Sequence, residues 1–192
     1  MKMITTNTQI TDHFNAFEFK CRCGCNAINI DEMFVQRMEL LWQLLHKAVD
    51  CHVIIVNSGY RCAKHSQIIK GAFIGDMHNI GAGADIHALT NSGKAIDSLT
   101  ICEAAQLCGF GGIAVIDDIN AHIDDRQRGD INYTNKSWYG NEATGESYFT
   151  FIGKSKNSKI LDSAFHGKTN AKQIKVTIEI DDHKYSGLLD GE

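Results

Sequence analysis

The strongest constraint on the fold is a glycine-rich stretch in the middle of the chain, residues 75–88, which reads GDMHNIGAGADIHA. A glycine inside a helix or strand costs roughly 0.5–1 kcal/mol relative to alanine, so the run from Gly81 to Gly83 gains nothing from either element. The stretch therefore predicts a tight loop. It places His78 and Asp85 seven positions apart, either as two metal ligands brought to one point or as polar residues of an ordinary surface turn.

Apolar residues on both sides of this loop repeat with the periods of helices and strands. Phe34, Met38, Leu41 and Leu45 recur at helical spacing, and Asp31 is a suitable N-cap for that helix. The expected elements are a helix over residues 31–49, a buried strand over 52–57, a short helix or turn over 62–72, a strand over 84–89, a helix over 93–108, and two short strands over 109–117 and 120–126 joined by an Asp-rich turn.

This order of elements predicts an α+β domain with a small antiparallel sheet and flanking helices. From about residue 127 the chain becomes polar and aperiodic, and near its end Val176, Ile178 and Ile180 alternate before a turn at Asp181 and Asp182. That alternation predicts a terminal β-hairpin. We therefore expect one domain over residues 1–140 and a C-terminal extension over 141–192, which can pack on the same domain.

The bulk composition excludes several classes of partner. With 19 basic and 23 acidic side chains the net charge is −4, which gives no electrostatic footprint for nucleic acid and no polybasic cluster for anionic lipid. No window approaches 18 apolar residues, so we expect no insertion into a membrane. Residues 1–14 lack the apolar run of a secretory signal, so we expect synthesis in the cytoplasm without a signal peptide.

A third metal ligand can be sought from the chemistry of zinc. Catalytic zinc usually takes three protein ligands and leaves one position for water. The best partner for His78 and Asp85 is the histidine of NAHIDDR, His122, because alternation along a strand puts it on the same face as Asp124. His87, two residues after Asp85, shares the face of that carboxylate and is a rival ligand.

Five motifs of the chain occur together in one known family. FKCRCGC, SGYRCAKH, HNIGAGAD, GFGGI and HIDDR followed by Trp138 stand in this order. Together they resemble the zinc D-Ala-D-Ala metallopeptidases, and in particular the short branch that is common in bacteriophage genomes. The resemblance covers roughly residues 10–140, which would then form a zinc peptidase domain, and it implies the fold shared with the Hedgehog signalling domain.

The resemblance also implies roles for individual residues. His78 and Asp85 match the ligands of the family's His-x6-Asp motif, and His122 matches the histidine of His-x-Asp-x-Arg, so these three should bind Zn²⁺. Arg61 matches an arginine that lies beside the metal in relatives and steadies the carbonyl or carboxylate of the substrate.

Tyr60 and Trp138 belong to the same motifs and are candidate substrate-binding residues. The chain departs from the family at Asp76, where serine is usual, and mildly at Gly83, where alanine is usual. Asp76 adds negative charge near the site, which would alter metal affinity or the response to pH.

The sequence leaves the general base open. A carboxylate must accept the proton of the attacking water. Asp124 shares a face with His122, but it could equally orient a ligand or pair with Arg126. Asp118 lies just upstream of the position where some relatives carry their base, with Asp117 beside it. We expect one of Asp124 and Asp118 to be catalytic.

The cysteines need a separate interpretation. Cys21, Cys23 and Cys25 could form a four-thiolate metal site with Cys62, but ligand pairs in structural zinc sites usually have two to four residues between them, and Cys-x-Cys is tighter. A disulfide under oxidising conditions and simple packing are the alternatives.

Two functions of different classes follow. The first is a zinc metallopeptidase of D-Ala-D-Ala carboxypeptidase or endopeptidase type, which cleaves peptidoglycan stem peptides at the bacterial cell wall as a phage endolysin or virion-associated lysin. Residues 141–192 would then contact the wall or the virion. The second is a non-catalytic zinc-containing binding or structural module on the same fold.

Overall fold

The chain folds into a mixed α+β structure built around a six-stranded sheet. The computed structural model describes residues 2–126, 138–167, 174–180 and 183–189, and it describes side chains for residues 2–126 and 139–167. The strands of the sheet, in spatial order, are β3 (Cys51–Ser58), β4 (Gly83–Thr90), β6 (Ala121–Asp124), β5 (Gly112–Val115), β7 (Trp138–Asn141) and β8 (Glu146–Tyr148).

The sheet is antiparallel only in part. Strands β3, β4, β6 and β5 pair antiparallel, as expected for the sheet, but β7 pairs with β5 in parallel. The expectation of a purely antiparallel sheet is therefore wrong at this edge. Parallel neighbours need a long connection between them, and residues 116–137, which include β6, join the end of β5 to the start of β7.

The longest helix forms where the apolar period predicts it. Helix α1 (Glu32–Val49) begins after Asp31, whose side chain accepts a hydrogen bond from the backbone N–H of Met33. It ends at Asp50, which adopts the left-handed conformation that often terminates helices. The four apolar residues that carry the period are all buried in the core: Phe34, Met38, Leu41 and Leu45.

Helix α3 (Ser98–Leu107) is shorter than expected. The expectation of a helix from residue 93 is wrong, because Asp97 acts as the N-cap and accepts a hydrogen bond from the N–H of Thr100. The residues before it turn back along β4 instead: Ile96 donates a backbone hydrogen bond to Ala88.

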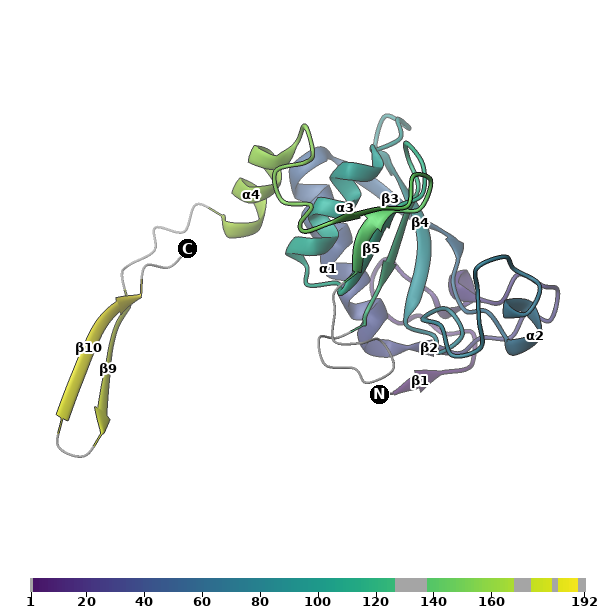
Figure 1. Ribbon diagram of the computed structural model, residues 1–192, viewed down its shortest axis with the longest axis horizontal. Helices are drawn as coiled ribbons and strands as arrows, with labels where there is room; N and C mark the ends of the chain where they lie inside the picture. The colour runs from purple at the N-terminus through teal and green to yellow at the C-terminus, as the bar shows by residue number, and fades with distance from the viewer. Residues whose placement is uncertain (1, 127–137, 168–173, 181–182, 190–192) are drawn as a thin grey trace.

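Helices cover one face of the sheet and leave the other for polar groups. In Figure 1, α1 and α3 lie on one side of β4 and β5, and α2 (Ala63–Ser66) with its adjoining loops lies on the other. Ile86, Ile113 and Ile123 point to the helical side, where all three are enclosed. Because side chains alternate along a strand, Asp85 and His122 belong to the opposite face.

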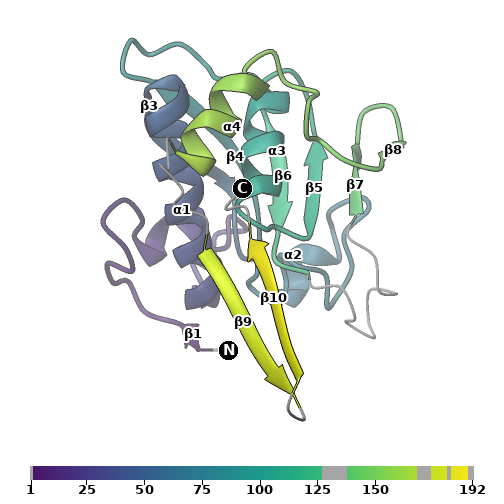
Figure 2. The same ribbon diagram turned by 90° about the vertical axis from the view of Figure 1, so that its left-hand side faces the viewer.

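The segment after residue 140 continues the same body of structure. Strand β8 pairs with β7, and helix α4 (Ser158–His166) lies beside α1 and α3 (Figure 2). Phe151 and Leu161 are fully enclosed in the shared core. The sequence predicted none of these elements, and the division at residue 140 stays a prediction.

Further short elements complete the chain. The two-residue strands β1 (Met3–Ile4) and β2 (Ile30–Asp31) pair antiparallel, and η1 (Ala16–Phe19) is a 3₁₀ turn. The predicted terminal hairpin forms from β9 (Ile174–Ile180) and β10 (His183–Leu189), and its expected turn at residues 181–182 lies outside the described residues. Among the described helices, none combines the length and the apolar character that crossing a membrane requires.

The enclosure of Phe151 makes a testable prediction about the region after residue 140. Phe151→Ala should lower the free energy of unfolding by about 3–5 kcal/mol, because it removes a fully buried aromatic ring that contacts Tyr139 and Tyr148. Phe149→Ala is the matched control, since that ring is 98% exposed and its loss should change stability by less than about 0.5 kcal/mol. Urea unfolding of the two variants measures both values, and equal losses would contradict the packing described.

Candidate metal centre

Three polar groups converge on the face of the sheet that the helices leave open. His78 Nε2 lies 3.3 Å from His122 Nδ1 and 3.3 Å from Asp85 Oδ1, and the distance from His122 Nδ1 to Asp85 Oδ1 is 2.9 Å. These three atoms form a nearly equilateral triangle. The structure therefore brings together the three residues that the sequence predicted as ligands.

The glycine loop delivers His78 to this point. His78 is buried, and its Nδ1 donates a hydrogen bond of 2.8 Å to the carbonyl of Gly59, which turns Nε2 toward the other two groups. Gly81 closes the loop with a φ of 81°, and a Cβ at this residue would lie 2.1 Å from the carbonyl oxygen of Asn29. Only glycine fits both the conformation and the space, which explains the run that interrupts the sequence here.

The register of the sheet brings the other two candidate ligands together. Asp85 in β4 lies directly opposite His122 in β6, so the two side chains share a face and a row. His122 Nε2 donates a hydrogen bond of 3.0 Å to Asp124 Oδ2, which leaves Nδ1 to face Asp85. The histidines thus present different nitrogens to the centre, Nε2 from His78 and Nδ1 from His122.

The donor set and its dimensions fit zinc. Zinc binds imidazole nitrogen and carboxylate oxygen at about 2.0–2.1 Å, so two ligands at tetrahedral angles lie about 3.3 Å apart. The three observed separations of 2.9–3.3 Å match that spacing. Two neutral imidazoles and one carboxylate supply three ligands, which leaves the fourth position of a tetrahedron for water or substrate.

Asp124 lies behind His122 and accepts a hydrogen bond from its Nε2. Its side chain is completely enclosed, and besides His122 it accepts hydrogen bonds from the guanidinium of Arg126. Gly112 lies opposite it in β5, where a Cβ would lie 2.2 Å from Asp124 Oδ1. The absence of a side chain at Gly112 therefore makes the space that the carboxylate occupies.

The charges around the centre favour a cation. Burial alone lowers the pKa of His122, but its hydrogen bonds to Asp124 and Asp85 outweigh burial and raise the pKa to about 10. Burial alone raises the pKa of Asp85, but His122 and His78 outweigh it and hold the pKa well below its usual range. Both shifts have one electrostatic cause, because the buried carboxylate of Asp124 and the partly buried one of Asp85 stabilise positive charge between them.

Arg61 holds the second oxygen of the carboxylate ligand. Its Nη2 donates a hydrogen bond of 2.6 Å to Asp85 Oδ2, and its Nε donates one of 3.0 Å to Ser58 Oγ. Its backbone N–H also donates to the carbonyl of His78. Arg61 therefore fixes one ligand through its side chain and steadies the loop of another through its backbone.

A cavity of about 350 Å³ opens beside the three ligands. Thirteen residues line it: Arg61, Ile69, Lys70, Gly71, Ala72, Phe73, Asp76, Met77, His78, Asp85, His122, Arg126 and Glu142. Cationic, apolar and carboxylate side chains line the cavity next to the candidate metal position. His78, Asp85 and His122 are themselves part of this wall.

The two carboxylates that the sequence nominated as bases do not line this cavity. Asp118 is exposed in the turn between β5 and β6, and Asp124 lies enclosed on the far side of His122. The carboxylates that line the cavity without belonging to the triangle are Asp76 and Glu142. Asp76 Oδ1 accepts a hydrogen bond from the N–H of Asn79 and its Oδ2 accepts one from that of Phe73, so it holds the loop.

Sequence reasoning missed Glu142. Gly140 in β7 lies opposite Ala114 in β5, which in turn lies opposite His122, so all three belong to one row of the sheet. Glu142 follows two residues after Gly140 and thus comes to the same face. No local sequence pattern predicts this placement of Glu142, because it depends on the parallel pairing of β7 with β5.

Other nominated residues lie away from the triangle. His87 in β4 contacts Asn57 of the neighbouring strand β3, with Nδ1 2.9 Å from its Oδ1, and is not in the group of three. Tyr60 is half-buried and donates its backbone N–H to Phe19, but it is not part of the cavity wall. Trp138 pairs with Gly112 at the start of β7, and its side chain lies outside the described ones.

Comparison with known proteins identifies the family. The sequence profile described as Peptidase M15 matches residues 12–124, which is more than half of the chain. The match contains all three members of the triangle. No curated protein and no solved structure gives a significant match.

The geometry separates the two histidines that compete as third ligand. His122→Ala should lose one equivalent of zinc per chain, because it removes one corner of the triangle. His87→Ala, which truncates the rival histidine on the neighbouring strand, should keep that equivalent. Metal analysis of both purified variants measures this, and an unchanged zinc content in His122→Ala would contradict the assignment.

Proposed function

The chain belongs to the peptidase M15 family, and from that premise we propose that it is a zinc-dependent peptidase that cleaves peptidoglycan stem peptides at a bond involving D-alanine. The observation that carries the proposal is the triangle of His78, Asp85 and His122 beside an open cavity. Zinc held there supplies a Lewis acid that polarises a carbonyl and activates water. The remaining steps rest on the chain's own residues.

Substrate binding is assigned to the wall of the cavity. Lys70 is exposed and offers positive charge for a carboxylate, such as the one that ends a stem peptide, or for the oxygen of a scissile carbonyl. Arg61 and Arg126, which already pair with Asp85 and Asp124, add to the positive charge of the same wall. Ile69 and Phe73 offer apolar surface for the small methyl side chains of alanine. This combination supports a short, acidic peptide as the substrate class.

Proton transfer is assigned to Glu142. The base must reach the attacking water directly or through one hydrogen bond. Glu142 lines the cavity and is exposed, and no hydrogen bond of its carboxylate to another described residue occupies it. Asp76 is the second candidate, but both of its oxygens already accept backbone hydrogen bonds. Asp124 is assigned the role of orienting His122, which the sequence had left as its alternative.

The biological role and the place of action are proposed from the sequence motifs of the chain. Their resemblance to the phage-type branch supports a lysin that acts at the bacterial cell wall, as an endolysin or as part of the virion. It also supports the Hedgehog-like arrangement of the fold. Residues 141–192 are the proposed contact with the wall or the virion, although residues 146–166 also pack against the body of the domain.

Activity is tested most simply on purified peptidoglycan. We expect the zinc-loaded chain to release stem-peptide fragments, chelation to abolish the release and added zinc to restore it, because the triangle then regains its cation. Mass spectrometry of the fragments identifies the bond and separates carboxypeptidase from endopeptidase action. A zinc-loaded chain that binds stem peptides but cleaves none would instead support the non-catalytic binding module.

The roles of the carboxylates give a second prediction. Glu142→Gln should keep zinc and lower the rate of hydrolysis by roughly 10²–10⁴, the usual contribution of a general base. Asp124→Asn should weaken zinc binding at this centre by about 10–100-fold, because it loosens the orientation of His122. Asp118→Asn, on the exposed turn, is the control and should change neither quantity.

Chelator competition measures zinc affinity, and hydrolysis is then compared at saturating zinc. If Glu142→Gln hydrolyses at the wild-type rate, the base assignment fails and Asp76 becomes the next candidate. If Asp124→Asn keeps full zinc affinity but loses hydrolysis, Asp124 itself is the base.

A further inference from the structure

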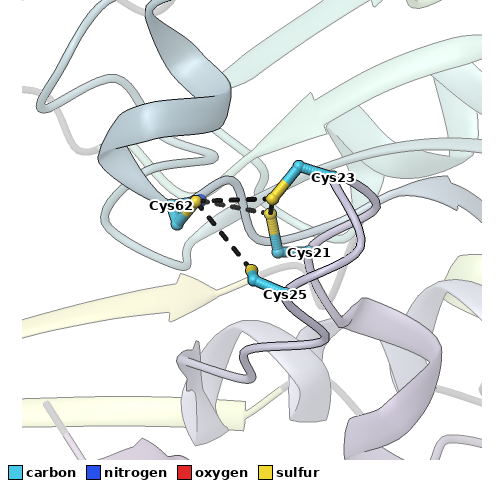
Figure 3. A group of neighbouring side chains, drawn as sticks. All are labelled: Cys21, Cys23, Cys25 and Cys62. Atoms are coloured by element: carbon cyan, nitrogen blue, oxygen red, sulfur yellow. Dashed lines mark hydrogen bonds between the residues drawn. The ribbon is translucent and has the colours of Figure 1, made fainter.

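A second group of potential metal ligands lies apart from the first. The sulfur atoms of Cys21, Cys23, Cys25 and Cys62 all lie within 4.8 Å of one another (Figure 3). The Sγ–Sγ distance is 3.5 Å from Cys21 to Cys23, 3.7 Å from Cys23 to Cys62, and 4.0 Å from Cys25 to Cys62. Three of the residues come from one N-terminal loop, and Cys62 immediately precedes α2.

We propose that these four cysteines bind a structural Zn²⁺, separate from the ion proposed for the cavity. Zinc binds thiolate sulfur at about 2.3 Å, so sulfurs at the corners of a tetrahedron lie about 3.8 Å apart. Three of the six separations, at 3.5–4.0 Å, surround that value, and the others stay within 4.8 Å. Four ligands complete the tetrahedron and leave no open position, as is usual in structural sites.

The local backbone explains how a tight Cys-x-Cys spacing can serve such a site. Cys21 and Cys25 have three residues between them, which is an ordinary ligand spacing, and Cys23 is the additional member. Gly24 and Asn26 both adopt a positive φ, of 93° and 54°, so the loop curls on itself. This curl lets all three cysteines of the loop face Cys62.

Backbone groups also point at the sulfurs. The N–H of Cys62 donates to Cys21 Sγ and the N–H of Ala27 donates to Cys25 Sγ, each at 3.5 Å. Such bonds stabilise the thiolate form that binds metal. Binding releases protons without any redox change, because four thiols become four metal-bound thiolates.

The arrangement favours a metal over disulfides. A disulfide joins two sulfurs at about 2.0 Å and sorts four cysteines into pairs. Here Cys62 lies at similar distances from Cys23 and from Cys25, and even the shortest separation, 3.5 Å between Cys21 and Cys23, is well beyond a bond. One central ion accounts for a set in which every sulfur is near every other.

The site would clamp the segment that supports the cavity. Cys62 follows Arg61, which holds Asp85, and Gly59 accepts the hydrogen bond of His78. The same segment is already tied to the N-terminal region, because the N–H of Tyr60 donates to the carbonyl of Phe19. A second zinc would thus fix the N-terminal loop and residues 59–62 to each other.

The test uses the full chain under reducing conditions and does not depend on peptidase activity. We expect two zinc ions per wild-type chain, and one in His122→Ala. Cys23→Ser/Cys25→Ser should lose the other ion and keep the one that His122→Ala loses. Cys108→Ser, which changes a cysteine outside the cluster, should keep both.

Cobalt gives an independent, spectroscopic readout of the ligand atoms. Co²⁺ bound by four thiolates shows strong sulfur-to-metal charge-transfer absorption in the near ultraviolet, whereas nitrogen and oxygen ligands do not. We expect this absorption in the wild type and in His122→Ala. A single zinc in the wild type that His122→Ala loses, or cobalt binding without that absorption, overturns the second site while leaving the proposed peptidase centre untouched.

Discussion

The candidate site depends first on the register between β4 and β6. Asp85 lies opposite His122, and this one pairing sets the carboxylate and the imidazole side by side on the open face of the sheet. A slip of one residue would turn every side chain of a strand to the other face. The register is held from the other side, where Ile86 and Ile123 lie in the core beneath the helices. Apolar burial therefore fixes the positions of the polar groups.

Two further constraints sharpen the geometry that the register provides. His122 can present Nδ1 because Asp124 takes its other nitrogen, and Asp124 has room only because residue 112 is glycine. His78 can present Nε2 because the carbonyl of Gly59 takes its Nδ1. In each case a partner behind the ligand selects the nitrogen that faces the centre.

Much of this architecture could be predicted from the sequence, and the limits have physical causes. The helical spacing of Phe34, Met38, Leu41 and Leu45 predicted α1, and the glycine run predicted the loop of His78. Both structures are determined by residues close together in the sequence. Strand alternation predicted on which face of the sheet Asp124 lies. It could not predict that the side chain is buried, since this burial depends on Gly112 in another strand. The sequence also did not predict that Glu142 lines the cavity, because its placement depends on the parallel pairing of β7 with β5, a strand distant in the sequence.

The central claim is that the fold preforms a triangle of ligands with defined donor atoms. The most direct measurement is the anomalous diffraction of zinc in crystals of the zinc-loaded chain. We predict an anomalous peak about 2.0–2.1 Å from His78 Nε2, from a carboxylate oxygen of Asp85 and from His122 Nδ1. A zinc ion coordinated by His122 Nε2 in place of Nδ1, or the absence of any anomalous peak between these three residues, would contradict the claim.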